Sequence, residues 1–486
     1  MLPIVTPEEM AAVDAAAPES VEVLIGRAGA AVAREALRML GGSYGRRVVV
    51  VAGKGNNGAD GRAASVLLRA RGVRCTVIDA AAMTGSAPPL PPCDLLIDAA
   101  YGTGFRGTFD PPPVPQRLRT TRRNGRSGGA SATRPLALAV DIPSGIDGLT
   151  GAVGGSPWAA DRTITFAALK PGLLLEPGAT IAGDVVVADI GLDTSSTSAH
   201  LVDLADLRNW LPAKPADTHK WKSAVWVIGG SDGMEGAAAL TARAAMRSGA
   251  GYVRWSAPTG RPPHEHKPVE VVAAALPTDG WAAEVLADAA RFGAIVVGNG
   301  LGLDPRHEAE LRRLVADCPV PIVCDADALT LLSRTGPMGE RAVFRPTTIV
   351  TPHEGEFARL AGAAPGPDRF TATRQLAAAL GCTVLLKGPC TIVASPDAQV
   401  LAARGADQRL ATLGTGDVLA GIIGALVAQG MTPAHAAAGG AVLHGAAARR
   451  GPARGLVAGD LPDLIPEVLA DFPARPVEPV LAERNR

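Results

Sequence analysis

Short apolar runs, each followed by a polar or glycine-rich loop, recur through the first 190 residues. The runs at 47–52, 94–99 and 136–140 are rich in Val, Leu and Ala and lack the alternation of a half-exposed strand. Such runs are typical of parallel strands that are buried on both faces. Further strands are expected at 75–79, 162–167 and 184–189, and helices at 21–40 and 62–71. This alternation predicts a doubly wound α/β sheet covered by helices.

The second half of the chain repeats this arrangement. Apolar runs that lead into polar or glycine-rich loops lie at 224–228, 252–255, 294–297, 321–324, 347–351 and 383–386. Between the halves, residues 192–200 (LDTSSTSAH) form a polar, Ser/Thr-rich stretch, which is the best candidate for a linker. We therefore expect two α/β domains, at 1–200 and 201–486, which suits a chain of 486 residues.

A Gly-Thr-Gly-Asp sequence at 414–417 precedes an apolar helical pattern at 418–430. Gly414 and Gly416 permit backbone geometry that a Cβ would forbid, so they can open a helix. Free N–H groups and the helix dipole attract an anion there, typically phosphate. The Asp417 carboxylate would repel phosphate, but it suits a catalytic base that faces a substrate hydroxyl beside the anion. The alternative is that Asp417 caps the helix.

Polar or glycine-rich loops follow three strands of the first half, at 53–61 (GKGNNGADG), 101–108 (YGTGFRGT) and 141–147 (DIPSGID). Ligands bind at the carboxyl edge of open α/β sheets, so these loops are expected to meet in one crevice. The side chains expected there are Asn57, Asp98, Asp141 and Ser144. The alternatives are a plain tight turn at 53–61 and a capping role for any single carboxylate.

Further polar motifs follow strands of the second half in a fixed order. They are G-N-G-L-G at 298–302, D-A-D-A-L at 325–329, T-P-H-E-G-E at 351–356 and L-L-K-G at 385–388. With the Gly-Thr-Gly-Asp sequence they indicate a nucleotide phosphate site beside a hydroxyl-activating aspartate, as phosphoryl transfer requires. Each also has a simpler interpretation. Lys387 and His353 are then surface residues, and the acids, which otherwise suit Mg²⁺ or another metal, are helix caps: Asp325, Asp327, Glu354 and Glu356.

Composition excludes several classes of function. The 47 basic and 47 acidic residues balance, and aromatic residues make up only 3%, so neither a nucleic-acid nor a membrane partner is expected. The six cysteines are scattered without a C-x-x-C pair, which suits a reducing cytosol. The sequence MLPIVTPEEM lacks the features of a signal peptide. We expect a cytoplasmic homo-oligomer with small-molecule substrates, in which the Arg-rich run at 117–134 is a surface insert.

The two sets of motifs closely resemble the bifunctional NAD(P)H-hydrate repair enzymes. In the first half, G-N-N-G-A-D-G, D-A-A-Y-G-T-G-F-R-G and D-I-P-S-G-I-D-G resemble the signatures of the epimerase domain. In the second half, H-K, G-G-S, G-T-G-D-V-L-A-G and the four motifs above resemble those of the dehydratase. The resemblance covers nearly the whole chain. It implies an N-terminal Rossmann-like and a C-terminal ribokinase-like domain, both of them three-layer sandwiches.

This resemblance implies repair of NADH and NADPH whose nicotinamide ring has added water at C6, the hydrates NADHX and NADPHX. The first domain, an isomerase, would interconvert the R and S epimers with a potassium ion. The second, a lyase, would dehydrate the S form with ADP and Mg²⁺, releasing AMP and phosphate. The C6 hydroxyl would be phosphorylated, and phosphate would then leave as the ring double bond returns. Asp417 would activate that hydroxyl.

The resemblance also assigns residues. Those implied to bind the hydrate in the epimerase are Asn56, Asn57, Gly58, Ala59, Asp60, Gly102, Thr103, Gly104, Phe105, Arg106, Gly107, Thr108 and Asp141. Asp141 is the implied catalytic contact to the ring, and the implied potassium ligands are Asn57, Asp98 and Ser144. In the dehydratase, the implied hydrate site is Gly300, His353 and Asp417. The implied nucleotide site is Lys387, Gly388, Pro389, Cys390, Thr391, Gly414 and Gly416.

The chain departs from the family pattern at Tyr101, Asn299, Pro389 and Cys390, without losing a carboxylate, amide or lysine that the chemistry needs. Two other functions stay open. A small-molecule kinase is one, because a fold does not fix a substrate, but a kinase has no use for G-N-N-G-A-D-G. A non-catalytic nucleotide-binding or scaffold protein is the other, and the intact acids and lysine argue against it.

Overall fold

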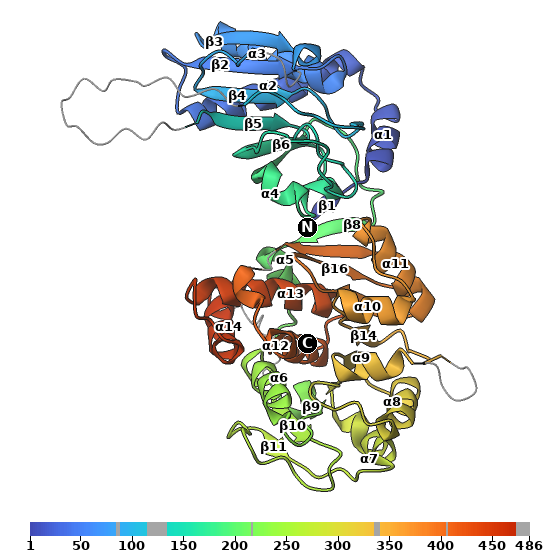
Figure 1. The fold of residues 1–486 in the computed structure, drawn as a ribbon. Coiled ribbons are helices and arrows are strands. Elements are labelled where there is room, and N and C mark those ends of the chain that lie inside the picture. The colour runs from blue at the N-terminus through green and yellow to red at the C-terminus, as the bar shows by residue number, and fades with distance from the viewer. Residues whose placement is uncertain (84–87, 114–133, 215–216, 335–340, 405–406, 473–486) are drawn as a thin grey trace, which may run out of the picture. The chain divides into compact units, whose positions relative to one another are not determined.

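The computed structural model describes residues 1–83, 88–113, 134–214, 217–334, 341–404 and 407–472. All but Arg134 of the expected insert at 117–134 lies outside these ranges. The chain divides into two compact units, Leu2–Ala199 and His200–Arg486, with Met1 grouped with the second. Each unit is an α/β structure built on its own sheet (Figure 1).

The first unit is built on a parallel sheet of six strands in the order β3-β2-β4-β5-β6-β7. Their bounds are β2 (Arg47–Ala52), β3 (Arg74–Asp79), β4 (Leu95–Ala99), β5 (Leu136–Val140), β6 (Arg162–Phe166) and β7 (Asp184–Ala188). The strands β2, β4 and β5 are buried except at the first residue of β2 and of β5, as their continuous apolar sequences predicted. Strands β3 and β4 lie on opposite sides of β2. The chain therefore leaves β2 toward one edge of the sheet and leaves β4 toward the other edge.

One face of this sheet packs against α2 (Val21–Leu40) and α3 (Asn56–Ala70). The other face is covered by irregular chain, including Phe109 and Trp158, by the 3-10 turn η1 (Ala80–Ala82) and, farther along, by α4 (Gly178–Ala182). The remaining elements of this unit are β1 (Leu2–Ile4), α1 (Pro7–Ala15) and η2 (Pro171–Leu173). The capping box expected at the start of α1 is present, because Thr6 and Glu9 exchange hydrogen bonds.

The sheet of the second unit has the order β8-β17-β16-β15-β14-β13-β12-β9-β10-β11. Its strands are β8 (Ala199–Val202), β9 (Ala224–Ile228), β10 (Tyr252–Ser256), β11 (Val272–Ala273), β12 (Ala294–Val297), β13 (Ile322–Cys324), β14 (Thr348–Val350), β15 (Thr383–Leu386), β16 (Cys390–Ala394) and β17 (Val400–Arg404). Neighbouring strands from β15 to β11 run parallel, whereas β15, β16 and β17 are antiparallel neighbours.

Helices cover both faces of this second sheet (Figure 1). On one face, α6 (Glu235–Arg247), α12 (Thr415–Ala428) and α13 (Pro433–Arg450) share the main hydrophobic core with the strands. The other helices are α5 (Leu204–Trp210), α7 (Trp281–Asp288), α8 (Arg306–Asp317), α9 (Asp327–Leu332), α10 (Glu354–Ala361), α11 (Arg369–Leu380) and α14 (Leu461–Ala470). No helix within the described ranges is long and apolar enough to cross a bilayer.

Two helices begin earlier than the sequence predicted. Residues 56–61, expected in a loop, form the first turns of α3, and α12 begins at Thr415 rather than after Asp417. In both cases a glycine occupies the N-cap, Gly55 or Gly414, and Gly414 has a φ of +90°. Glycine and asparagine at these positions had indicated a loop, but they also suit the cap and first turn of a helix.

Two candidate active sites

The first site lies at the carboxyl ends of the neighbouring strands β2 and β4, from which the chain continues to opposite sides, as expected for an open α/β sheet. The loops after these strands approach closely, and Gly53 is required there because an added Cβ would lie 1.9 Å from the carbonyl oxygen of Ala100. A cavity of about 860 Å³ opens at this point. Its lining includes, among the residues assigned to the hydrate, Asn56, Asn57, Asp60, Gly102, Thr103, Gly104, Phe105, Arg106 and Asp141.

Four assigned residues do not line this cavity. Gly58 packs against Gly53, whose carbonyl oxygen would lie 1.9 Å from an added Cβ at Gly58. Ala59 belongs to the first turn of α3, where its N–H donates to the carbonyl oxygen of Gly55. Gly107 and Thr108 are exposed beyond the cavity wall. These four residues therefore belong to the chain segments around the cavity but do not line it.

The expected cluster of Asn57, Asp98 and Ser144 forms behind the cavity. Ser144 donates to Asp98 from its hydroxyl, at 2.6 Å, and from its backbone N–H, at 2.9 Å. Asn57 Nδ2 donates to the carbonyl oxygen of Tyr101 at 2.8 Å, and the Tyr101 N–H donates to Ser144 Oγ at 2.9 Å. The backbone of Tyr101 thus connects Asn57 to the buried Asp98–Ser144 pair.

This cluster contains an unsatisfied oxygen acceptor. Asn57 Oδ1 is buried and has no hydrogen-bond partner, which is costly unless a cation or water meets it. Burial raises the pKa of Asp98, although the hydrogen bonds from Ser144 oppose that effect. Amide, hydroxyl and carboxylate oxygens suit a hard cation. In the described part of the chain, no group of three or more His, Cys, Asp or Glu side chains could hold a metal ion. The oxygen atoms of Asn57, Asp98 and Ser144 are thus the groups of this cluster that could contact a hard cation.

Asp141 is held by a buried lysine that the sequence analysis did not single out. Lys170 is only 1% exposed, and its Nζ donates to Asp141 Oδ1 at 2.7 Å. It also donates to Thr165 Oγ1 at 2.8 Å, and Thr165 in turn donates to Asp141. Asp141 has a φ of +65°, a strained conformation for a residue with a side chain, and such strain is concentrated at functional sites.

Two further carboxyl groups face the same cavity. Burial, with the charges of Asp141 and Asp14, raises the pKa of Asp60 to about 8. Asp14 comes from α1, lines the cavity, and has its own pKa raised by burial. A neutral Asp60 beside the lysine-paired Asp141 gives this pocket one group that can donate a proton and one that can accept it.

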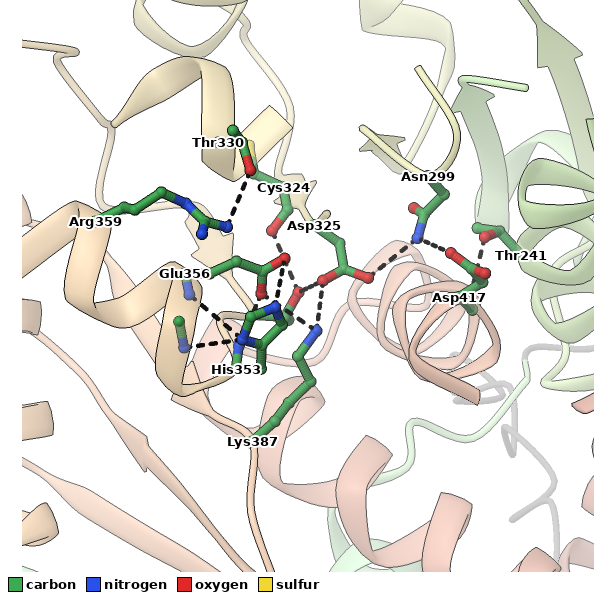
Figure 2. A network of polar contacts seen from close by, with 12 residues as sticks. Thr241, Asn299, Cys324, Asp325, Thr330, His353, Glu356, Arg359, Lys387 and Asp417 are labelled. Carbon is green, nitrogen blue, oxygen red and sulfur yellow. Dashed lines mark hydrogen bonds and ion pairs between the residues drawn. The ribbon is translucent and has the colours of Figure 1, made fainter. Parts of the chain in front are cut away.

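The second site is a network of polar side chains that joins the G-N-G-L-G, D-A-D-A-L, T-P-H-E-G-E, L-L-K-G and Gly-Thr-Gly-Asp motifs of the second half (Figure 2). Asn299 Nδ2 donates to Asp417 Oδ1 at 2.7 Å and to Asp325 Oδ2 at 3.0 Å. Lys387 Nζ donates to Asp325 Oδ1 at 2.8 Å and lies 3.7 Å from Glu356 Oε2. Side chains from β12, β13, α10, β15 and α12 thus meet at the carboxyl edge of the sheet.

Asp417 stands in the first turn of α12, but no side chain caps this helix. The Asp417 carboxylate accepts a hydrogen bond from the side chain of Asn299, which follows β12, and not from the backbone of α12. Burial raises the pKa of Asp417 to about 6, although the hydrogen bond from Asn299 lowers it. A carboxylate with a pKa near neutrality at a helix mouth is well matched to general-base catalysis.

The acids beside this network also make contacts within the protein. Glu356 and His353 form the capping box of α10, in which His353 Nδ1 accepts from the Gly355 N–H at 2.9 Å. Asp327 accepts from the Gly302 N–H at 2.8 Å. Glu356 thus caps α10 and Asp327 holds the loop at Gly302, while His353 Nε2 lies 3.6 Å from Glu356 Oε1 within the same network (Figure 2).

The residues assigned to the nucleotide lie beside this network. An added Cβ at Gly416 would lie 3.7 Å from Lys387 Nζ, so the glycine mouth of α12 adjoins the lysine. Residues 387–391 form the turn between β15 and β16, and Cys390 and Thr391 already belong to β16. Burial raises the pKa of Cys390 to about 12, which leaves its thiol inert. Gly300 adopts a φ of +65° and packs closely on Met234.

Family models match both halves of the chain. Residues 225–470 match a family described as NAD(P)H-hydrate dehydratase. Residues 21–89 and 79–172 match a family described as YjeF-related protein N-terminus.

Whole-chain relatives agree with these matches. A bifunctional NAD(P)H-hydrate repair enzyme of Mycobacterium tuberculosis is 38% identical over 425 residues, which cover 84% of each chain. One from Moorella thermoacetica is 34% identical over 485 residues, with 88% of each chain covered. Among solved structures, a ribokinase-like superfamily protein of Enterococcus faecalis is 22% identical, with a TM-score of 0.51, over 57% of this chain and 98% of that one. This structural likeness confirms the ribokinase-like fold expected for the second half.

Proposed function

The chain belongs to the family of bifunctional NAD(P)H-hydrate repair enzymes, and from this membership we propose how its two sites divide the work. The protein is an enzyme that repairs hydrated NADH and NADPH by epimerisation and dehydration. The epimerase is assigned to residues 1–200 and the dehydratase to residues 201–486. The first rests on the cavity around Asp141 and the second on the network around Asp417.

The buried Asp417 carboxylate at the mouth of α12 is the observation that carries the dehydratase assignment. Asp417 removes the proton of the C6 hydroxyl as its oxygen attacks the terminal phosphoryl group of ADP, and AMP leaves. Phosphate then departs from C6 with the bonding electrons, C5 loses a proton, and the C5–C6 double bond of the reduced nicotinamide returns. Lys387 and the N–H groups of Gly414 and Gly416 stabilise the phosphoryl charge, and Mg²⁺ accompanies the nucleotide phosphates.

In the epimerase, the two carboxyl groups of unlike protonation handle the C6 hydroxyl. The hydroxyl leaves as water with the proton of Asp60, while the ring nitrogen lone pair forms the C=N bond of an iminium ion. Water then adds to the opposite face of C6, and Asp141 takes its proton. Exchange with solvent resets both acids. Lys170 holds the Asp141 carboxylate in place through the hydrogen bond that its Nζ donates to Oδ1.

The assay of both activities tests this assignment. Adding ADP and the S hydrate of NADPH to the protein is expected to restore absorbance at the reduced-nicotinamide band, with one AMP released per NADPH. The R hydrate is expected to react faster than its spontaneous epimerisation allows. A protein that instead phosphorylated a sugar or vitamin, and left both hydrates unchanged, would be a small-molecule kinase.

Potassium is proposed at Asn57, Asp98 and Ser144, where it would supply a positive charge beside the substrate phosphates. The unpartnered Asn57 Oδ1 supports this site. Potassium is expected to raise the unfolding temperature of the first unit, whereas lithium at equal ionic strength is not. Asn57→Ala is expected to remove this difference, because it deletes the orphaned oxygen. An equal potassium response in wild type and variant would rule the site out.

A further inference from the structure

Asn299 occupies a central and buried position in the second site. It follows β12, between Gly298 (φ +119°) and Gly300 (φ +65°), and it is 1% exposed. Its Nδ2 donates both of its hydrogens to carboxylates, one to Asp417 at 2.7 Å and one to Asp325 at 3.0 Å (Figure 2). An amide nitrogen has two donors, so the two carboxylates use the whole donor capacity of this side chain.

The orientation of this amide is set by charge. If the amide were turned over, Asn299 Oδ1 would face Asp325 Oδ2 and Asp417 Oδ1, and both carboxylate oxygens would lose the hydrogen bond that Nδ2 donates to them. In the observed orientation Oδ1 is buried without a partner, which costs free energy. The NH₂ group offsets this cost, because it lies between two carboxylates whose like charges would otherwise repel each other across the site.

Asn299 also completes a continuous connection between the two reactive ends of the site. Lys387 donates to Asp325 Oδ1, Asn299 donates to Asp325 Oδ2, and the same Nδ2 donates to Asp417. A phosphate that attracts Lys387 would weaken its hold on Asp325. Any such change at Asp325 reaches Asp417 through one amide group.

We propose that Asn299 is a positioning residue of the dehydratase, which orients the Asp417 carboxylate toward the substrate hydroxyl and couples it, through Asp325, to the nucleotide-binding lysine. The inference rests on the proposed function of the second site. The inference assigns a role to a residue that does not itself contact the substrate and that in the sequence is only a departure from the family pattern.

Several charged groups act on Asp417 besides this amide. Asp325 and Asp327 raise its pKa, Lys387 lowers it, and burial is the largest cause of its raised value. Removing the Asn299 donor leaves burial and the two acids opposed only by Lys387. The pKa of Asp417 is therefore expected to rise above its value of about 6, and the ionised base is lost at a higher pH.

Asn299→Ala and Asn299→Asp test this role. In both, the acid limb of the pH profile for dehydration is expected to move up by about one pH unit or more, since a hydrogen bond to a charged group is lost. We expect kcat to fall at least tenfold at neutral pH, with KM for ADP changed less than threefold. The isosteric aspartate variant should be the more impaired of the two, because it adds a third carboxylate.

Thr351→Val is the matched control. Thr351 donates to the same Asp325 at 2.8 Å but does not contact Asp417, and valine keeps the shape of the side chain. Its acid limb is expected to move much less than that of Asn299→Ala, because the hydrogen bond from Asn299 to Asp417 remains. A merely structural role for Asn299 predicts a lower unfolding temperature and an unchanged pH profile, which would overturn the proposal. Epimerisation by the same chain reports that the first unit is intact in every variant.

A readout without turnover separates this inference from the proposed function. Difference infrared spectroscopy follows the C=O stretch of protonated Asp417, identified by its absence in Asp417→Asn. Its midpoint, near pH 6 in wild type, is expected to rise in Asn299→Ala and to change much less in Thr351→Val. If the midpoint in Asn299→Ala equals that of the wild type, the positioning role of Asn299 is wrong, even if the wild type dehydrates NADPHX. If the midpoint moves but the wild type does not dehydrate NADPHX, the assigned function is wrong instead.

Discussion

Asp417→Asn is expected to lower the rate of NADPHX dehydration by about 10²- to 10⁴-fold, the usual contribution of a general base. Asparagine has nearly the same shape, but it cannot accept the hydroxyl proton. The loss should fall on kcat, because the proposed ADP site consists of Lys387 and the glycine mouth of α12 and does not include the carboxylate. The measurement is single-turnover recovery of reduced-nicotinamide absorbance, with epimerisation of the R hydrate followed in the same sample.

The matched control for this variant is Asp203→Asn. Asp203 also stands at a helix N-terminus of the second unit, where it caps α5 by accepting from the N–H groups of Ala205 and Asp206. Asparagine caps a helix about as well as aspartate, so this variant should keep full activity. If Asp417→Asn kept full dehydration activity, Asp417 would not be the catalytic base, and its role would be a structural one at the N-terminus of α12.

The sequence predicted the buried strands well, because their signal is local. The runs at 47–52 and 383–386 coincide with β2 and β15, and the polar loops after them meet at one sheet edge in each unit. That edge follows from parallel topology alone, so residues as distant as Lys387 and Asp417 could be placed in one site. The strand expected at 162–167 ends one residue early, because Ala167 turns the chain with a φ of +61°.

The partners of individual side chains could not be predicted from local patterns. Lys170 resembles any surface lysine in its Ala-Leu-Lys-Pro context, yet it is buried against a carboxylate 29 residues away. Asn299 was noticed as a departure, but its two partners lie 26 and 118 residues further along the chain. Such contacts depend on how the strands are ordered in the sheet. An unexplained lysine just after a strand end was the only available signal for Lys170.

Asp141→Asn is expected to slow epimerisation by about 10²-fold or more while dehydration of the S hydrate continues. The same change should destabilise the first unit. Lys170, which is 1% exposed, would then have only uncharged acceptors: the asparagine side-chain oxygen, Thr165 Oγ1 and the Phe166 carbonyl oxygen. Removing one partner of a buried ion pair typically costs about 3–5 kcal/mol. Denaturant unfolding with a probe in each unit measures this loss.

The double variant Asp141→Asn, Lys170→Met separates catalysis from stability. Removing both charges leaves no unpaired ion in the interior, and methionine fills much of the volume of lysine. Replacing a whole buried pair by apolar groups is often neutral, so most of the lost stability should return. Epimerisation should not return, because no carboxylate remains to take the proton at C6. If the double variant were no more stable than Asp141→Asn, Lys170 would not be charged against Asp141 in the folded protein, and the proton-accepting role given to Asp141 would lose its support.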